Sequence, residues 1–396
     1  MPKNLWLIVI GMVINVTGSS FLWPLNTIYL HEHLGKSLSV AGLVLMANAG
    51  ATVLGNLLGG VLFDKIGGYR SILVGAITTL AALIGLTFNH TWPLYVWWLV
   101  IIGFGSGLIF PAMYAMAGTV WKEGGRRAFN AVYVAQNLGV AVGSALGGLI
   151  ASFSFDYIFI ANTIMYIVFF LLVVFTYRNI ESIDVVTTSV IEEQKAMKND
   201  RKLYALLAVC AGYLLCWIGY SQWTSTISAY TQEIGVSLRQ YSLLWTINGA
   251  LIVLGQPFVN KIVYAFMKKV KAQLIVGMFI LMASFAVAAF ATNFAGFLTA
   301  MIVLTVGEML VWPAVPTIAS ELSPKGKEGF YQGIVNSTAT AGRMVGPLLG
   351  GVLVDFYGMQ MMFIVLMGLF VLAMGTTLLY DKILNAKASE KYSVAK

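Results

Sequence analysis

The sequence predicts an all-α membrane protein with twelve transmembrane helices, arranged as two pseudo-symmetric six-helix bundles. Its 396 residues are 59% hydrophobic and 10% charged, which leaves too few charges to cover a soluble protein of this length. Apolar runs of about 20 residues recur along the chain, the length that a helix needs to cross about 30 Å of hydrocarbon. The second half also repeats motifs of the first. A transmembrane β-barrel would show short alternating segments instead.

The apolar runs define each expected span in turn. The first run continues to about residue 30, too long for a signal peptide. The spans of the first half are expected at 5–30, 38–63, 71–88, 94–120, 128–151 and 157–177. Those of the second half are expected at 203–231, 238–264, 272–291, 297–320, 330–353 and 361–380. We therefore expect a first bundle over 1–177, a linker over 178–202, a second bundle over 203–380 and a tail over 381–396.

Basic residues set the expected orientation, because they gather in alternate connections between spans. The opposite set of connections offers only Lys36, with Arg239 just inside the next span. This bias predicts a cell-membrane protein with both termini and the linker in the cytoplasm. It also explains the net charge of +8 without a nucleic-acid partner. Besides the four lysines of the tail, the basic set comprises Lys3, Lys65, Arg70, Lys122, Arg126, Arg127, Arg178, Lys195, Lys198, Arg201, Lys202, Lys268, Lys269, Lys271, Lys325 and Lys327.

Four pairs of similar segments occur in the same order in the two halves, about 200 residues apart. NAGATVLGNL at Asn48 resembles NGALIVLGQP at Asn248, and GSGLIFPA at Gly105 resembles GEMLVWPA at Gly307. GVAVGSALGGLI and ILVG in the first half have counterparts in GRMVGPLLGGVL and LIVG in the second. Six plus six helices in one order form a parallel repeat. Such repeats predict a transporter with its substrate path near the membrane midplane between the halves.

The loop between the second and third spans carries the most specific motif. Gly60, Asp64, Lys65, Gly67 and Arg70 fit G-x-x-x-D-[RK]-x-G-x-[RK]-[RK] in all but one basic position. On this motif the chain resembles the major facilitator superfamily, over essentially its whole length. The resemblance implies that these residues form a latch that helps to hold the outward-open state. The alternative is an ordinary charged loop that fixes the topology.

Within that superfamily the chain resembles the twelve-helix drug:proton antiporters, in particular a bacterial multidrug transporter. The first span contains WPLNTIYL, and the tenth contains GEMLVWP, which matches a tenth-helix motif with a membrane glutamate. The resemblance implies that Glu308 binds protons and substrate. The chain departs from the branch in the fourth span, which lacks the family's arginine, and at Ser144, which replaces a proline. Val132 and Thr224 occupy positions that are acidic in the relative.

Two ionisable groups lie well inside the expected spans, Glu308 and Arg343. A lone charged side chain at the bilayer centre costs at least about 2.5–3.5 kcal/mol on insertion scales. From the helix rise, Glu308 is about 17 Å and Arg343 about 20 Å from the start of its own span, so both lie near midplane. We expect them to pair directly or through water and to form the proton-coupling element. The alternative is a static ion pair. Gly342, Gly346 and Gly350 form a separate stripe suited to helix packing.

Polar and aromatic residues at mid-depth are candidates for a substrate cavity. Drug-sized pockets are mostly apolar and aromatic, with a few polar anchors. The alternative is the aromatic belt that membrane proteins carry at both interfaces. The candidates are Trp23, Asn26, Tyr114, Tyr133, Gln136, Asn137, Tyr220, Gln222, Trp223, Trp245, Asn248 and Trp312.

The favoured function is proton-coupled efflux of amphipathic drugs or related small molecules by alternating access. The alternatives are a transporter of one metabolite (a sugar, amino acid, peptide or organic anion) and a flippase for lipids or lipid-linked molecules. An enzyme is excluded because no P-loop, metal-ligand spacing or nucleophile constellation occurs. Cys210 and Cys216 point to different sides of one helix, which predicts neither a disulfide nor a metal site. We expect no cofactor, and a monomer whose partners are the substrate, protons and the lipid bilayer.

Overall fold

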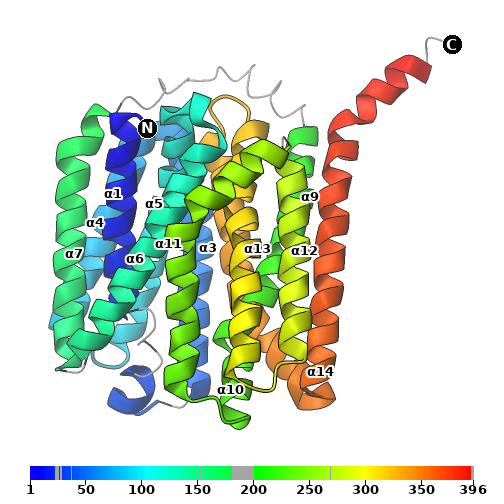
Figure 1. The fold of residues 1–396 in the computed structure, drawn as a ribbon. Helices are drawn as coiled ribbons and strands as arrows, with labels where there is room; N and C mark the ends of the chain where they lie inside the picture. Colours follow the sequence, from blue (N-terminus) through cyan, green and yellow to red (C-terminus); the bar gives the residue numbers. More distant parts are fainter. Residues whose placement is uncertain are drawn as a thin grey trace. The chain divides into compact units, whose positions relative to one another are not determined.

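The computed structural model describes residues 1–22, 26, 29–36, 38–151, 153–180, 200–267 and 269–393 (Figure 1). Within these ranges the chain forms helices joined by turns and contains no strand. The predicted all-α fold is therefore confirmed. Most of the predicted linker, residues 181–199, lies outside the described ranges.

The chain divides into two compact units by its internal contacts. The first unit comprises Met1–Thr187 together with Lys325–Thr340. The second comprises Thr188–Pro324 and Ala341–Lys396. The segment Lys325–Thr340 thus belongs to the second predicted bundle by sequence and to the first unit by contact.

The described residues of 1–187 in the first unit form six long helices and three short helical turns. Figure 1 shows these long helices side by side, coloured from blue to blue-green and green along the chain. The elements are α1 (Lys3–Leu22), η2 (Tyr29–His33), α3 (Leu38–Ile66), α4 (Gly68–Phe88), α5 (Leu94–Val120), η3 (Lys122–Gly124), α6 (Arg126–Ala151), α7 (Phe155–Thr176) and η4 (Tyr177–Asn179).

The second unit contains the remaining helices, and its predicted first span is divided into three pieces. These pieces are α9 (Asp200–Tyr220), η5 (Ser221–Thr224) and α10 (Thr226–Glu233). The others are α11 (Leu238–Phe266), α12 (Val270–Ala289), α13 (Phe294–Leu322) and α14 (Glu328–Ser393), of which the first turns belong to the first unit.

Ten helices of the described chain are long and apolar enough to cross a membrane. This count omits α6 and treats α14 as one helix, although α14 is interrupted at Gly358, where φ is 80° and ψ is 168°. The segments on either side of Gly358 are 328–357 and 359–393. With α6 included and these two segments taken separately, the described chain is consistent with the twelve predicted helices.

Helix boundaries follow local chemistry at several loops. The side chains of Ser154 and Asn293 cap α7 and α13 by accepting bonds from the backbone N–H groups of Asp156 and Gly296. Ser237 and Gln240 form a capping box at the start of α11. Between α3 and α4, Gly67 adopts a φ of 85°, a conformation that suits glycine and permits the tight turn expected from the motif.

Large apolar side chains cover the outward faces of both units. Phe88 and Phe175 are 85% and 73% exposed in the first unit, and Leu254 and Phe266 are 79% and 81% exposed in the second. Soluble proteins rarely expose so much contiguous apolar surface. These faces are suited to contact with lipid, as expected for membrane helices.

The internal repeat is visible in how small residues pack within each unit. In the first, Gly139, Gly143 and Gly147 of α6 lie against α1, where an added Cβ would meet Val16, Thr17 and Phe21. In the second, a Cβ on the three glycines of α14, Gly342, Gly346 and Gly350, would meet Trp217, Ser221 and Gln222. The predicted packing role of that α14 stripe is confirmed.

Candidate functional site

Glu308 lies in the middle of α13 and is 1% exposed. The amide nitrogen of Asn248, on α11, donates a hydrogen bond to Oε1 of Glu308 and a second bond, of 3.0 Å, to Oγ1 of Thr305. The side chains of Tyr220 and Trp312 also form hydrogen bonds with the Glu308 carboxyl group. The carboxylate is thus held by three neutral donors from α9, α11 and α13.

Tyr220 and Trp312 belong to a group of five aromatic side chains that contact one another and are called the aromatic cluster below. They are Tyr213, Trp217 and Tyr220 of α9, Trp245 of α11 and Trp312 of α13. The rings of Trp217 and Trp312 are parallel, with centroids 4.5 Å apart and planes inclined by 6°. The rings of Tyr213 and Tyr220 meet Trp312 edge-on, at centroid distances of 5.5 and 5.4 Å. Trp245 adds a further edge contact with Tyr220, at 6.1 Å.

Arg343 joins the cluster from α14. Its guanidinium carbon lies over the ring of Trp217, 4.9 Å from the centroid. Contacts therefore run from Arg343 to Trp217, from Trp217 to Trp312, and from Trp312 to Glu308. The two membrane charges predicted from the sequence meet the same group of aromatic rings. Their direct or water-mediated pairing remains a prediction.

The packing of α14 on α9 explains why Arg343 reaches Trp217. Gly342 precedes Arg343, and a Cβ there would lie 2.5 Å from Cβ of Trp217. One turn later, a Cβ on Gly346 would lie 2.9 Å from the carbonyl oxygen of Ile218. The absent side chains let the two helices approach closely, and this brings the base of Arg343 next to the indole.

Gln222 and Trp223 of η5 were predicted to line a cavity, and both are fully buried. The Gln222 amide donates bonds to the carbonyl oxygens of Ile218, at 2.9 Å, and Gly346, at 2.7 Å. Trp223 lies edge-on to Phe297, and its carbonyl oxygen accepts a bond from the hydroxyl of Tyr241. These contacts serve the packing of the second unit, and a cavity role for the two residues remains a prediction.

In the first unit, the structure brings two of the predicted cavity residues together. The hydroxyl of Tyr114, on α5, donates a 2.9 Å bond to Oε1 of Gln136, on α6. Asn137 donates to the carbonyl oxygen of Tyr133 within its own helix. This pair of helices contains no counterpart of Glu308, since Ser106 of α5 bonds the carbonyl oxygen of Gly103.

Asn26 lies in a different environment, at the end of the first unit that carries η2. Its Oδ1 accepts a 2.7 Å bond from the hydroxyl of Tyr95. Tyr95 in turn packs on Tyr29, with ring centroids 4.9 Å apart. His90 lies nearby, with Nε2 3.4 Å from Oδ1 of Asp156. Trp23, another predicted cavity residue, lies outside the described residues.

The residues of the predicted latch lie at the opposite end of the first unit. The two carboxylate oxygens of Asp64 accept bonds of 2.7 and 2.8 Å from the backbone N–H groups of Gly329 and Phe330. Asp64 thus caps the N-terminus of α14, where an anion is favoured by the helix dipole. A Cβ on Gly60 would lie 2.2 Å from the carbonyl oxygen of Gly329, so the two backbones touch. Lys65 and Arg70 of the same motif are exposed.

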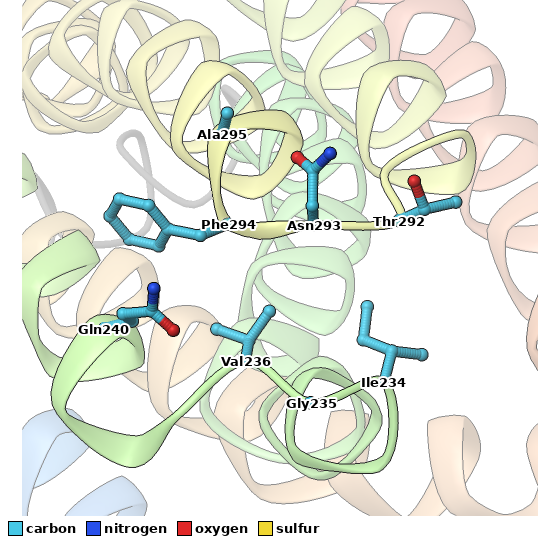
Figure 2. A pocket seen from close by; sticks show the side chains of 8 residues that line it. All are labelled: Ile234, Gly235, Val236, Gln240, Thr292, Asn293, Phe294 and Ala295. Atoms are coloured by element: carbon cyan, nitrogen blue, oxygen red, sulfur yellow. The ribbon is translucent and has the colours of Figure 1, made fainter.

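A shallow pocket of about 440 Å³ lies apart from these residues, between the α10–α11 and α12–α13 loops (Figure 2). Figure 2 shows Gln240 near Phe294, and Val236 and Ile234 below the loop that holds Asn293 and Thr292. None of its lining residues is ionisable. The pocket therefore has no group suited to bind a proton or to anchor a charged substrate.

The repeated helical units and the buried carboxylate of α13 are typical of a secondary membrane transporter. The chain belongs to the Major Facilitator Superfamily, whose model matches residues 8–272 and 224–393. The predicted superfamily, and the expectation of a transporter and not an enzyme, are therefore confirmed.

Individual relatives refine this assignment. The chain is 60% identical over 392 residues to the uncharacterized MFS-type transporter YttB of Bacillus subtilis (strain 168), covering 99% of this chain and 98% of YttB. It is 24% identical over 369 residues to the quinolone resistance protein NorA of Staphylococcus aureus (strain MRSA252), covering 90% and 91% of the two chains. Its fold resembles the crystal structure of the human organic anion transporter MFSD10 (TETRAN), with a TM-score of 0.76, 15% identity and coverage of 95% and 100%.

Two members of the aromatic cluster, Tyr213 and Trp217, were not predicted from the sequence. With Tyr220 they are spaced i, i+4 and i+7, so one face of α9 carries all three rings. This spacing could have identified them. Arg343 was predicted as a charged group, but its contact with an indole was not.

Proposed function

We propose that this protein exports amphipathic small molecules in exchange for protons, by alternating access. We further propose that it does so in the cell membrane, with both termini in the cytoplasm. The observation that carries the proposal is the Glu308 carboxyl group, buried in the middle of α13 and in contact with the aromatic cluster. Membrane carboxylates are rare and costly, and they mark ion and proton pathways.

The surroundings of Glu308 support a role in proton exchange. Its contacts are with the amide of Asn248, the hydroxyl of Tyr220 and the indole of Trp312, all of them neutral. A charge so placed is stabilised by hydrogen bonds but loses its hydration, so the neutral acid is a second accessible state. A substrate that binds best to the ionised carboxylate would then compete with a proton, which neutralises it, for the same side chain, Glu308. This competition is the differential binding that coupled transport requires.

The aromatic cluster supports an amphipathic substrate. Rings of Trp and Tyr offer large rigid surfaces with a polar tip, which suit flat molecules of varied structure. Trp217, Tyr220 and Trp245 are only half-buried, so part of the cluster is accessible. The similarity to NorA, which is named as a quinolone resistance protein, agrees with a drug-like substrate.

We also propose that the contact between Asp64 and the N-terminus of α14 is the latch of the transport cycle. Two backbone N–H groups bind its carboxylate, and the close approach of Gly60 and Gly329 lets α3 reach that helix end. Substitutions that separate these backbones should therefore slow transport, measured as an initial efflux rate.

Dye efflux from cells that express the protein tests the main proposal. We expect export of several unrelated dyes, and its loss when an uncoupler removes the proton gradient. In proteoliposomes, Glu308→Gln should bind substrate but no longer move protons when substrate is released, because the amide cannot titrate. Ser106→Ala, at the equivalent position of the first repeat, is the matched control and should keep coupled export. Unchanged proton movement in Glu308→Gln would refute the proposed role.

A second candidate function is the transport of one organic anion. The observation that favours it is Arg343, an exposed guanidinium in the same cluster. Saturable transport of a single anionic metabolite, with no dye efflux, would support this function in place of the first.

A further inference from the structure

The aromatic cluster already holds a cation that belongs to the protein. The guanidinium of Arg343 lies 4.9 Å from the centroid of Trp217, a distance typical of cation–π contacts. Guanidinium is flat, delocalised and weakly hydrated, and it stacks readily on aromatic faces. In these properties it resembles flat organic cations more closely than an ammonium group does.

The cluster offers such a cation more than one surface. Trp217 stacks on Trp312 with planes inclined by 6°, and Tyr213 and Tyr220 make three edge contacts with this pair, at centroid distances of 5.3–5.5 Å. The side chain of Trp312 also contacts the Glu308 carboxylate, whose hydrogen bonds are with neutral donors. A cation that entered the cluster would therefore meet aromatic faces and a counter-charge together.

The packing of α14 on α9 does not depend on the Arg343 side chain. This side chain is exposed, and it is joined to α14 by a flexible stem. The backbone of Arg343 is fixed by the glycines on either side, because α14 packs on α9 through Gly342 and Gly346. Displacement of the guanidinium would thus change the occupancy of the Trp217 ring and leave the packing intact.

We propose that Arg343 is a tethered cation that competes with flat organic cations for the aromatic cluster, and so determines which charged molecules the site accepts. The inference deepens the proposed function, because it assumes that the cluster is the substrate site. A flat cation and the guanidinium repel each other and compete for the same rings, whereas a neutral flat molecule is not repelled. Arg343 therefore distinguishes positively charged from neutral molecules.

Binding to the purified full-length protein in detergent tests this inference with two probes of one shape. N-methylacridinium carries a permanent positive charge, and acridine is uncharged at neutral pH. Replacing Arg343 with methionine should tighten N-methylacridinium binding about two- to fivefold, because a cation–π competitor at an exposed position is removed. Acridine binding should change by less than about twofold, since an uncharged ring can stack against a guanidinium or against a methionine side chain of similar size. Arg343→Lys keeps the charge but replaces the flat guanidinium with a strongly hydrated ammonium group, so its affinity for N-methylacridinium should lie between those of the wild type and Arg343→Met.

A second variant separates competition for the ring from simple charge repulsion. In a Trp217→Leu background, Arg343→Met should no longer tighten N-methylacridinium binding, because the ring for which the two cations compete is absent. A gain that persists without Trp217 would overturn the proposal, as would unchanged or weaker cation binding in Arg343→Met alone. If Arg343→Met does not fold, Arg343→Gln gives the same comparison.

A third probe, acridine-9-carboxylate, tests the opposite role. If the wild type binds this anion and Arg343→Met does not, the arginine anchors anions and the proposal is wrong. Efflux measurements distinguish a failure of the proposed drug export from a failure of the tethered-cation proposal. Competition at the ring without export of any cation would refute drug export and leave the tethered cation standing, whereas export with no effect of Arg343 would refute the tethered cation alone.

Discussion

At one position in the repeat the second unit has a carboxylate where the first has a hydroxyl. Ser106 bonds the carbonyl oxygen of Gly103 in its own helix, and the amide of Asn48 bonds the carbonyl oxygen of Leu99. In the second unit, the equivalent amide of Asn248 bonds Glu308. The same helix frame therefore holds a backbone contact in one unit and an ionisable side chain in the other, which is why the asymmetry points to function.

Asn248 is expected to hold Glu308 in place, and its removal tests this. Asn248→Ala removes one of the three donors to the Glu308 carboxylate and the donor to the hydroxyl of Thr305, which should cost about 1–3 kcal/mol of unfolding free energy. Asn137→Ala is the control, because the amide of Asn137 bonds a carbonyl oxygen in its own helix and alanine is the better helix former. Unfolding in mixed micelles measures both. Equal losses in the two variants would contradict a specific role for Asn248.

The sequence was informative about single residues wherever a residue type was costly in its surroundings. Glu308 and Arg343 were identified because charges are rare inside membrane spans, and Asn248 because its amide lies at mid-depth. Spacing alone could not show that Arg343 would lie on Trp217 or that Gln222 would bond the backbone of Gly346. Those contacts depend on how far each helix is rotated about its axis, which close packing decides.

Among the helices, the contact of α3 with the start of α14 is the closest that the latch motif makes. A Cβ on Gly60 would meet the carbonyl oxygen of Gly329 at 2.2 Å, and one on Gly329 would meet that of Gly60 at 2.3 Å. Asn56 and Ser337 add bonds to Thr340 and Val53 along the same pair of helices. The glycines of the motif therefore serve this helix contact as well as the turn at Gly67.

Gly60→Ala should weaken the latch, because its methyl group would overlap backbone atoms that cannot rotate away. We expect a loss of about 1–3 kcal/mol in stability, as for other overpacked sites, and a slower initial rate of efflux. Gly50→Ala is the matched control in the same helix, because a Cβ there meets nothing within 4 Å. It should gain about 0.5–1 kcal/mol from helix propensity and transport normally. Equal efflux by the two variants would show that the close approach is not needed for the cycle.

The presence of the helices could be predicted because apolar runs of membrane length are unambiguous. The break inside the predicted span 203–231 could not be predicted in this way. The predicted span 203–231 is divided into α9, η5 and α10, a break that hydropathy averages over and does not detect. The interruption of α14 at Gly358 lies in the expected gap between the spans 330–353 and 361–380.

Across the whole molecule, the repeat explains which features are shared and which are not. Glycines of α6 pack on α1 in the first unit as glycines of α14 pack on α9 in the second. The aromatic cluster, Glu308 and Arg343 all belong to the second unit. Shared packing thus builds two similar scaffolds, and the chemistry proposed for transport is concentrated in one of them.

Membrane topology provides the last test, because the predicted orientation rests on basic residues alone. The 29 residues of α13 extend about 43 Å at 1.5 Å per residue, more than the hydrocarbon thickness. Its two ends must therefore lie on opposite sides of the membrane.

Thr292, before α13, and Lys325, after it, are both exposed. The uneven distribution of basic residues among the connections places Lys325 in the cytoplasm. In intact cells, a membrane-impermeant thiol reagent should label Thr292→Cys and should reach Lys325→Cys only after permeabilisation. The native Cys210 and Cys216 are buried and should give little background. Labelling of Lys325→Cys from outside would reverse the orientation and, with it, the proposed direction of transport.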